Sequence, residues 1–108
     1  MDTEKIEQVL KPFAEYFLKI CNERHWKRNW SNGGCYLHLE VSEFIEALRG
    51  KGNPEDETGD IFFVFLAMLE EHGISIKESF DHLLKKLENI DEHPNIVDKT
   101  IKHTGKDD

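Results

Sequence analysis

Residues 53–69 read NPEDETGDIFFVFLAML, and this stretch decides the fold that we expect. Asn53 is a typical N-cap, Pro54 suits the first helical position, and acids are favoured at the positive end of a helix. The nine residues from Ile61 to Leu69 are then apolar on every side of that helix. Such a helix is buried all round. We therefore predict an obligate oligomer, a homodimer or homotetramer, in which a second subunit covers part of this helix. The side chains expected at that contact are Phe62, Phe63 and Leu66.

Three further segments of helical length lie between turn signals. Residues 6–21 repeat apolar side chains every three or four positions, and Pro12 predicts a kink or restart there. Residues 35–49 carry a second stripe, which ends at Gly50. A capping box at 75–78 begins the last segment, which we expect to end at Pro94. The members of the second stripe are Leu37, Val41, Phe44, Ile45 and Leu48.

Helices alone account for this pattern, because no segment alternates with the period of a strand. We predict an all-α fold, a bundle of four helices, in one domain over residues 1–94. Residues 95–108 form a polar C-terminal tail. A chain of 108 residues is too short for two domains and is marginal as an isolated fold.

Charge and cysteine content exclude several classes of protein. The formal net charge is -8, which disfavours general nucleic-acid binding. The longest apolar run is far shorter than the roughly 18 residues of a membrane span, so we expect no membrane insertion. With two cysteines and no signal-peptide pattern, the chain suits a reducing, cytoplasmic location.

Two pairs of acids stand out beside the apolar stripes. Glu40 and Glu43 share one face of the second segment, and Glu57 and Asp60 repeat the same spacing just before the apolar run. The short connection between the segments makes the two helices antiparallel neighbours, so the pairs can face each other. Solvent-exposed surface charge is the alternative interpretation for each pair alone.

Four converging carboxylates would repel one another, and a divalent cation relieves that repulsion. Oxygen ligands in this number suit Mg²⁺, with Mn²⁺ as a second possibility. A different metal site is also open at this stage. Cys21 and His25, together with Cys35 and His38, have a spacing that permits a zinc clip.

At this point the residues resemble a family. Glu40-Val-Ser-Glu43 followed by Glu57-Thr-Gly-Asp60 is similar to the acidic signature of the MazG-like all-α nucleoside triphosphate pyrophosphohydrolases, and Glu-Val-small-Glu is closest to the dCTP pyrophosphatase-like branch. The stretch Glu23-Arg24-His25-Trp26 also resembles that branch. The chain departs from many relatives at Val41, at Val64 and over residues 90–93, where a basic cluster is replaced.

The resemblance implies hydrolysis of a nucleoside triphosphate between its α- and β-phosphates, giving a monophosphate and pyrophosphate, in the service of nucleotide-pool sanitation. Glu40, Glu43, Glu57 and Asp60 would then be both the catalytic residues and the ligands of Mg²⁺. Aromatic planes stack on nucleobases, so Trp26 and Trp30 are candidates for base binding. Lys85 and Asn89 share a helix face and are candidates for contact with phosphate.

Two other functions remain compatible with the sequence. One is a non-catalytic nucleotide- or metal-binding helical bundle, which the missing basic cluster favours. The other is a helical protein-interaction module whose apolar helix is a partner interface.

Overall fold

The computed structural model describes residues 1–26 and 34–89, with side chains from residue 37 onward in the second range. Within these ranges the chain forms four helices and no strand: α1 (Thr3–Glu23), α2 (Gly34–Leu48), α3 (Pro54–Glu71) and α4 (Ile76–Glu88). The all-α prediction is confirmed. Trp30 and the polar tail lie outside the described residues. None of the described helices combines the length and the apolarity that crossing a membrane requires.

Local sequence explains where α3 and α4 begin. The Asn53 side chain accepts a hydrogen bond from the backbone N–H of Asp56, with Pro54 at the start of α3. The Ser75 hydroxyl accepts one from the backbone N–H of Glu78 in the same way. Each cap satisfies a backbone donor that the first helical turn leaves without a partner. Both predicted helix starts are therefore confirmed.

Two expected interruptions are corrected. Helix α1 continues from Thr3 to Glu23 with Pro12 inside it, so it does not restart there. Pro12 is exposed, and the carbonyl that loses its helical partner can therefore bond to water. Helix α4 ends at Glu88 rather than at Pro94, because the Asn89 side chain donates to the Lys85 carbonyl and caps the last turn.

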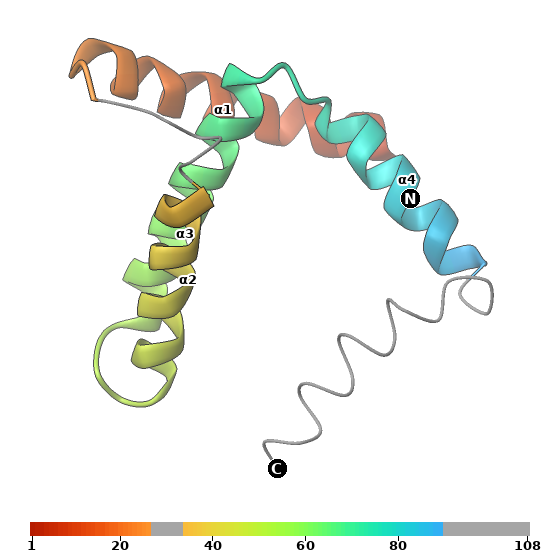
Figure 1. Cartoon of the computed structure of the whole chain (residues 1–108). Coiled ribbons are helices and arrows are strands. Elements are labelled where there is room, and N and C mark those ends of the chain that lie inside the picture. Colours follow the sequence, from red (N-terminus) through yellow and green to blue (C-terminus); the bar gives the residue numbers. More distant parts are fainter. Residues whose placement is uncertain (27–33, 90–108) are drawn as a thin grey trace.

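Helix α3 is the hub of the fold. It packs against α2 in an antiparallel hairpin and against α1, which in turn packs against α4 (Figure 1). The core is small and lies where α1, α3 and α4 meet, at Ala14, Leu66 and Ile76. The hairpin extends away from α1, and α4 diverges from it on the other side (Figure 1). The result is an open arrangement of helices.

The side chains of the all-apolar run of α3 lie in three different environments. Leu66 is only 5% exposed and belongs to the core, and Phe63 packs against Phe17 of α1. Leu66 is therefore a core residue of the single chain, which corrects its assignment to an intersubunit contact, whereas such a contact for the half-buried Phe63 stays a prediction. Phe62 and Phe65 remain exposed. Oligomeric state is not tested by these contacts and stays a prediction.

The apolar stripe on α2 also has both buried and exposed parts. Phe44 is half-buried and Ala47 is buried, whereas Val41, Ile45 and Leu48 are exposed. The main neighbour of α2 in the described part of the chain is α3, which covers only one side of the helix. Within a single chain the stripe is therefore only partly buried.

Candidate metal centre

The four acidic side chains singled out above converge on one point of the hairpin. Glu40 and Glu43 come from α2, and Glu57 and Asp60 come from the first turns of α3. One carboxylate oxygen from each residue lies within 4.8 Å of the others. The predicted juxtaposition of the two pairs is therefore observed, although what they bind is not.

The hairpin connection explains why the pairs meet. Helix α2 ends at Leu48, and Gly50 adopts a φ of +88°, a left-handed conformation in which a residue with a Cβ is strained. Asn53 then caps α3, so five residues separate the two helices. Such a short turn makes the helices antiparallel neighbours, and residues at similar distances from the turn face each other.

The electrostatics of the cluster are unfavourable without a cation. Partial burial raises the pKa of Glu40, and the nearby charges of Glu43, Asp60 and Glu57 raise it further. Burial also raises the pKa of Glu57, as do a hydrogen bond with Glu43 and the charge of Asp60. Both shifts arise because a charged carboxylate loses water and gains like-charged neighbours. The folded chain therefore holds protons or a cation at this point more readily than separate glutamates would.

Two atoms in the cluster test whether a metal would fit. One side-chain oxygen of Glu40 and one of Glu57 are buried and accept no hydrogen bond from the described residues. Buried polar atoms normally have a partner, and leaving one without costs about 1–3 kcal/mol. The donor set is entirely carboxylate oxygen, which matches hard divalent cations such as Mg²⁺ and Mn²⁺. The residues present thus fit such an ion.

Trp26 contacts α3, the helix that carries Glu57 and Asp60, through an aromatic side chain. After α1, His25 takes a φ of 54° and turns the chain back, and the backbone N–H of Trp26 donates to the Cys21 carbonyl. The indole then packs edge-on against Phe63, with ring centroids 6.1 Å apart. Phe63 follows Asp60 by three residues, so it lies one turn further along the same side of α3.

Much of the indole remains available to a ligand. Trp26 is 49% exposed, and the Arg24 guanidinium lies 5.8 Å from its ring centroid. Sequence reasoning named Trp26 but missed the supporting roles of Phe63 and Arg24. The spacing of Phe63 from Asp60 was a usable signal, because residues three apart share a helix side.

The structure supports the remaining candidate residues less well than it supports the four acids. Lys85 and Asn89 lie at the end of α4, which contacts α1 and diverges from the hairpin (Figure 1), so the chain does not bring them to the acidic cluster. Their contact with phosphate remains a prediction. The zinc alternative is likewise untested, because Cys35 lies outside the described side chains. Among the described residues, the four carboxylates form the only group with the geometry of a metal site.

A carboxylate cluster between facing helices is an arrangement that helical proteins use to hold metal ions. The profile of the MazG nucleotide pyrophosphohydrolase domain matches residues 33–96, more than half of the chain. The chain therefore belongs to the MazG family, as the resemblance indicated. Comparisons with curated proteins and with solved structures find no significant match, and the dCTP pyrophosphatase-like branch is not confirmed.

Proposed function

We propose that this protein is a Mg²⁺-dependent nucleoside triphosphate pyrophosphohydrolase that releases pyrophosphate and a nucleoside monophosphate, and that it acts on the cytoplasmic nucleotide pool. The observation that carries the proposal is the convergence of Glu40, Glu43, Glu57 and Asp60 within a chain of the MazG family. The proposal includes no nucleic-acid partner, because a net charge of -8 disfavours binding to a phosphate backbone, and it includes no membrane.

The acidic cluster can bind a triphosphate only if a cation lies between the carboxylates and the phosphates. Four carboxylates and a triphosphate repel each other directly, and Mg²⁺ or Mn²⁺ held by Glu40, Glu43, Glu57 and Asp60 would supply charge neutralisation and Lewis acidity. The buried oxygens of Glu40 and Glu57 are the best placed of the described atoms to hold such an ion, because they lack other partners.

The same side chains can move a proton. Hydrolysis needs a base that accepts a proton from the attacking water, and a carboxylate is a better base when its pKa is raised. The pKa values of Glu40 and Glu57 are both raised above the ordinary 4.5 by burial and by neighbouring acids. We assign the proton-accepting role to one of these two glutamates.

Trp26 would bind the base of the nucleotide. Its indole rests on Phe63, one helical turn of about 5 Å beyond Asp60 on the same side of α3. A nucleotide whose phosphates lie at the acidic cluster could therefore extend along α3 and stack its base on the indole. Trp30 is a second candidate, and Lys85 and Asn89 are candidates for the phosphates, without support from the described geometry.

The proposal is tested by incubating the full-length protein with a panel of ribo- and deoxynucleoside triphosphates. We expect monophosphate and pyrophosphate in the presence of Mg²⁺ and no turnover with a chelator. Asp60→Asn should reduce turnover by at least about 100-fold, since each ligand contributes to charge neutralisation and positioning. The control is Glu46→Gln, because Glu46 pairs with Arg49 on the surface and lies outside the cluster. Diphosphate and orthophosphate as products would contradict the proposal.

A non-catalytic metal- or nucleotide-binding bundle is the second candidate. The position of Lys85 on the diverging end of α4 favours it, because no described lysine or arginine pairs with the acidic cluster. In that case metal or nucleotide raises the melting temperature, and no triphosphate in the panel is hydrolysed.

A further inference from the structure

Two cationic side chains lie at the loop end of the hairpin, outside the acidic cluster. Residues 34–71, which span the hairpin, contain nine acids but only two lysines or arginines, Arg49 and Lys51. The Arg49 guanidinium lies 3.2 Å from one carboxylate oxygen of Glu46, and the Lys51 ammonium lies 3.6 Å from the other. Two positive charges thus share one negative charge, so this end of the hairpin carries a local surplus of positive charge.

The backbone of the loop explains why both cations reach the same carboxylate. The Gly50 N–H donates to the Ala47 carbonyl, and the Lys51 N–H donates to the Glu46 carbonyl, which together form a Schellman helix end. The φ of +88° at Gly50 is the left-handed conformation that this helix end requires. The chain therefore turns back at Lys51 toward the last turn of α2, where Arg49 also begins.

The cations, the acidic cluster and Trp26 follow one another along the hairpin. Glu46 comes three residues after Glu43, so it lies one turn nearer the loop on the same side of α2. Phe63, on which Trp26 packs, comes three residues after Asp60 and lies one turn further from the loop, because α3 runs in the opposite direction. The acidic cluster therefore lies between the cations at one end and the indole at the other.

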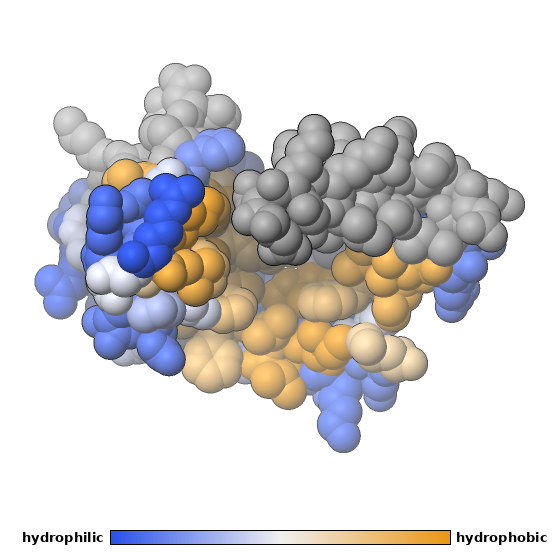
Figure 2. All heavy atoms as spheres, turned by 90° about the horizontal axis from the view of Figure 1, so that it is seen from below, coloured by the Kyte–Doolittle hydropathy of each residue, from blue (hydrophilic) through white to orange (hydrophobic). Residues whose placement is uncertain are grey.

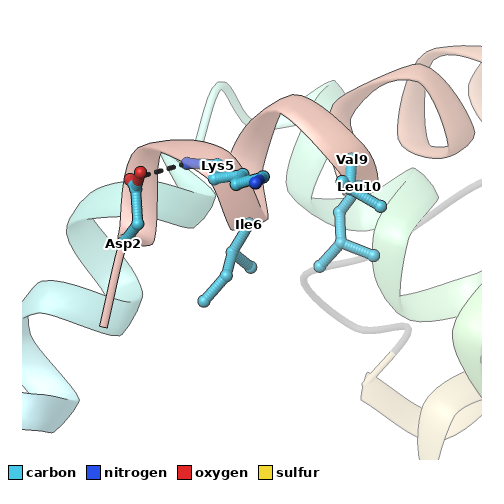
Figure 3. A pocket seen from close by; sticks show the side chains of 5 residues that line it. All are labelled: Asp2, Lys5, Ile6, Val9 and Leu10. Carbon is cyan, nitrogen blue, oxygen red and sulfur yellow. Dashed lines mark hydrogen bonds between the residues drawn. The ribbon is translucent and has the colours of Figure 1, made fainter.

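Two other described lysines are less suited to a substrate at the acidic cluster. Lys85 lies on α4, which diverges from the hairpin (Figure 1). Lys5 lies beside an open hollow of about 430 Å³, but the lining there is mostly apolar, with Ile6 and Leu10 pointing toward it (Figure 3). A polyphosphate buried against apolar side chains would leave its charges without partners. Hydrophilic side chains gather instead at the loop end of the hairpin, which is nearest the viewer in Figure 2.

We propose that Arg49 and Lys51 bind the β- and γ-phosphates of the triphosphate, the part of the substrate that leaves as pyrophosphate. This inference rests on the proposed function and supplies the cations that α4 does not bring to the acidic cluster. A nucleotide with its base on Trp26 and its α-phosphate at the cluster directs its remaining phosphates toward the loop. There the guanidinium and the ammonium donate charge-assisted hydrogen bonds to phosphate oxygens.

The same contacts stabilise the leaving group. Water adds to the α-phosphorus and gives its proton to a glutamate of the cluster, while the bond from that phosphorus to the bridging oxygen breaks. The bridging oxygen keeps the electron pair of the broken bond. Negative charge therefore develops on the pyrophosphate, next to Arg49 and Lys51, and positive groups placed where charge develops lower the barrier.

Glu46 is the counter-ion of the two cations while no substrate is bound. The Arg49 and Lys51 side chains are 67% and 73% exposed, and ion pairs at such exposure are weak. A phosphate group carries more negative charge than one carboxylate and can accept from both cations, so it displaces Glu46. Because Glu46 makes no contact with the substrate, Glu46→Gln should not lower turnover.

The first test is calorimetric binding of inorganic pyrophosphate, with Mg²⁺, to the full-length protein, which requires no turnover. Arg49→Gln/Lys51→Gln should weaken this binding by at least about 10-fold, because it removes two charge-assisted contacts. The control is Lys5→Gln/Lys86→Gln, which makes the same change in net charge with two exposed lysines outside the hairpin. It should change the affinity by less than about twofold, since distant surface charges are screened by salt. Equal weakening in the two double variants would overturn the proposal, and so would a wild-type protein that binds no pyrophosphate.

Steady-state kinetics on the preferred triphosphate provide a second measurement. Arg49→Gln/Lys51→Gln should raise KM by at least about 10-fold, whereas inhibition by the monophosphate product should stay at the wild-type level, since that product lacks the β- and γ-phosphates. Arg49→Lys, which keeps the charge, should retain most of the affinity. Weaker inhibition by the monophosphate in the double variant would mean that the whole site is disturbed, and would overturn the assignment. Pyrophosphate binding that depends on Arg49 and Lys51, in a protein that hydrolyses no triphosphate, would overturn the proposed function alone.

Discussion

Glu43 links the two halves of the acidic cluster, because one of its carboxylate oxygens lies within 4.8 Å of those of the other three acids and it contributes to the raised pKa of both Glu40 and Glu57. Burial is the largest cause of both shifts, and the like charges of the cluster add to it. A raised pKa means that protons compete with a divalent ion for these oxygens, so the affinity for the ion should increase as the pH rises through the raised pKa values.

Removing one charge from the acidic cluster should weaken metal binding without lowering the stability of the metal-free fold. Mg²⁺ or Mn²⁺ at 100 times its Kd should stabilise the wild-type fold by about 2.7 kcal/mol. Glu43→Gln should lose most of this gain while being at least as stable as the wild type without metal, since it relieves repulsion. Thermal melting with and without the ion measures both effects. Glu46→Gln should respond to the metal as the wild type does, and equal responses from the two variants would refute the assignment.

Trp26 leads to a prediction about recognition of the nucleotide base rather than about the hydrolysis step. Trp26→Ala removes a stacking surface worth about 1–3 kcal/mol, so KM should rise by roughly 5- to 150-fold with a smaller change in kcat. Trp26→Phe should recover most of the lost affinity. Steady-state kinetics on the preferred triphosphate distinguish the two parameters. A fall in kcat with KM unchanged would mean that the indole acts on the cluster and not on the base.

At the scale of the elements, polar contacts fasten α4 to α1. The Glu7 carboxylate accepts hydrogen bonds from the Ser75 hydroxyl and the Lys77 backbone N–H, each at 3.2 Å, and so caps the start of α4. Thr3 donates to Asp81, which also pairs with Lys77 at 2.7 Å. The hydrogen bond from the Lys77 backbone is the main cause of the lowered pKa of Glu7, and the one from the Lys77 side chain is the main cause of the lowered pKa of Asp81.

This attachment should depend on pH. A carboxylate whose folded pKa is lowered contributes stability above its unfolded value, 4.5 for Glu7, and loses that contribution as the pH falls through the folded value. Glu7→Gln should therefore melt below the wild type at pH 7, and the difference should shrink as the pH falls below 4.5 and through the lowered folded pKa. Glu15→Gln is the control, since Glu15 is exposed on the same helix. A difference that persists at low pH would exclude the carboxylate charge as the cause.

The starts of α3 and α4, the end of α2 and the acidic cluster were predictable because they depend on near neighbours in the sequence. Asn53, Ser75 and Gly50 act within a few residues, and the two acid pairs meet because a short turn joins their helices. Which apolar stripe is covered depends instead on distant packing. Sequence periodicity cannot distinguish Val41 from Phe44, because the difference comes from α3, which packs against one side of α2 only. The angle of α4, which places Lys85 away from the cluster, likewise follows from its contact with α1.

At the scale of the whole molecule, stability depends on one small junction. Leu66 of α3 lies between Ala14 of α1 and Ile76 of α4, with Phe17, Leu69 and Phe80 packed around them. Three helices meet there, and α4 has its main contact through α1. A cavity at Leu66 would therefore loosen α3, which carries Glu57 and Asp60, and α4, which carries Lys85.

Leu66→Ala should lower the free energy of unfolding by about 2–5 kcal/mol, because it removes buried methyl groups and leaves a cavity. A domain of this size is stable by about 5–15 kcal/mol, so this loss brings the variant close to unfolding only at the low end of that range, where metal or subunit association should restore stability. Urea unfolding followed by circular dichroism, with and without Mg²⁺, measures the loss. Val9→Ala provides the comparison, since Val9 is exposed on α1 and should change stability by less than about 1 kcal/mol. Equal losses from the two substitutions would mean that the junction around Leu66 does not hold the helices together.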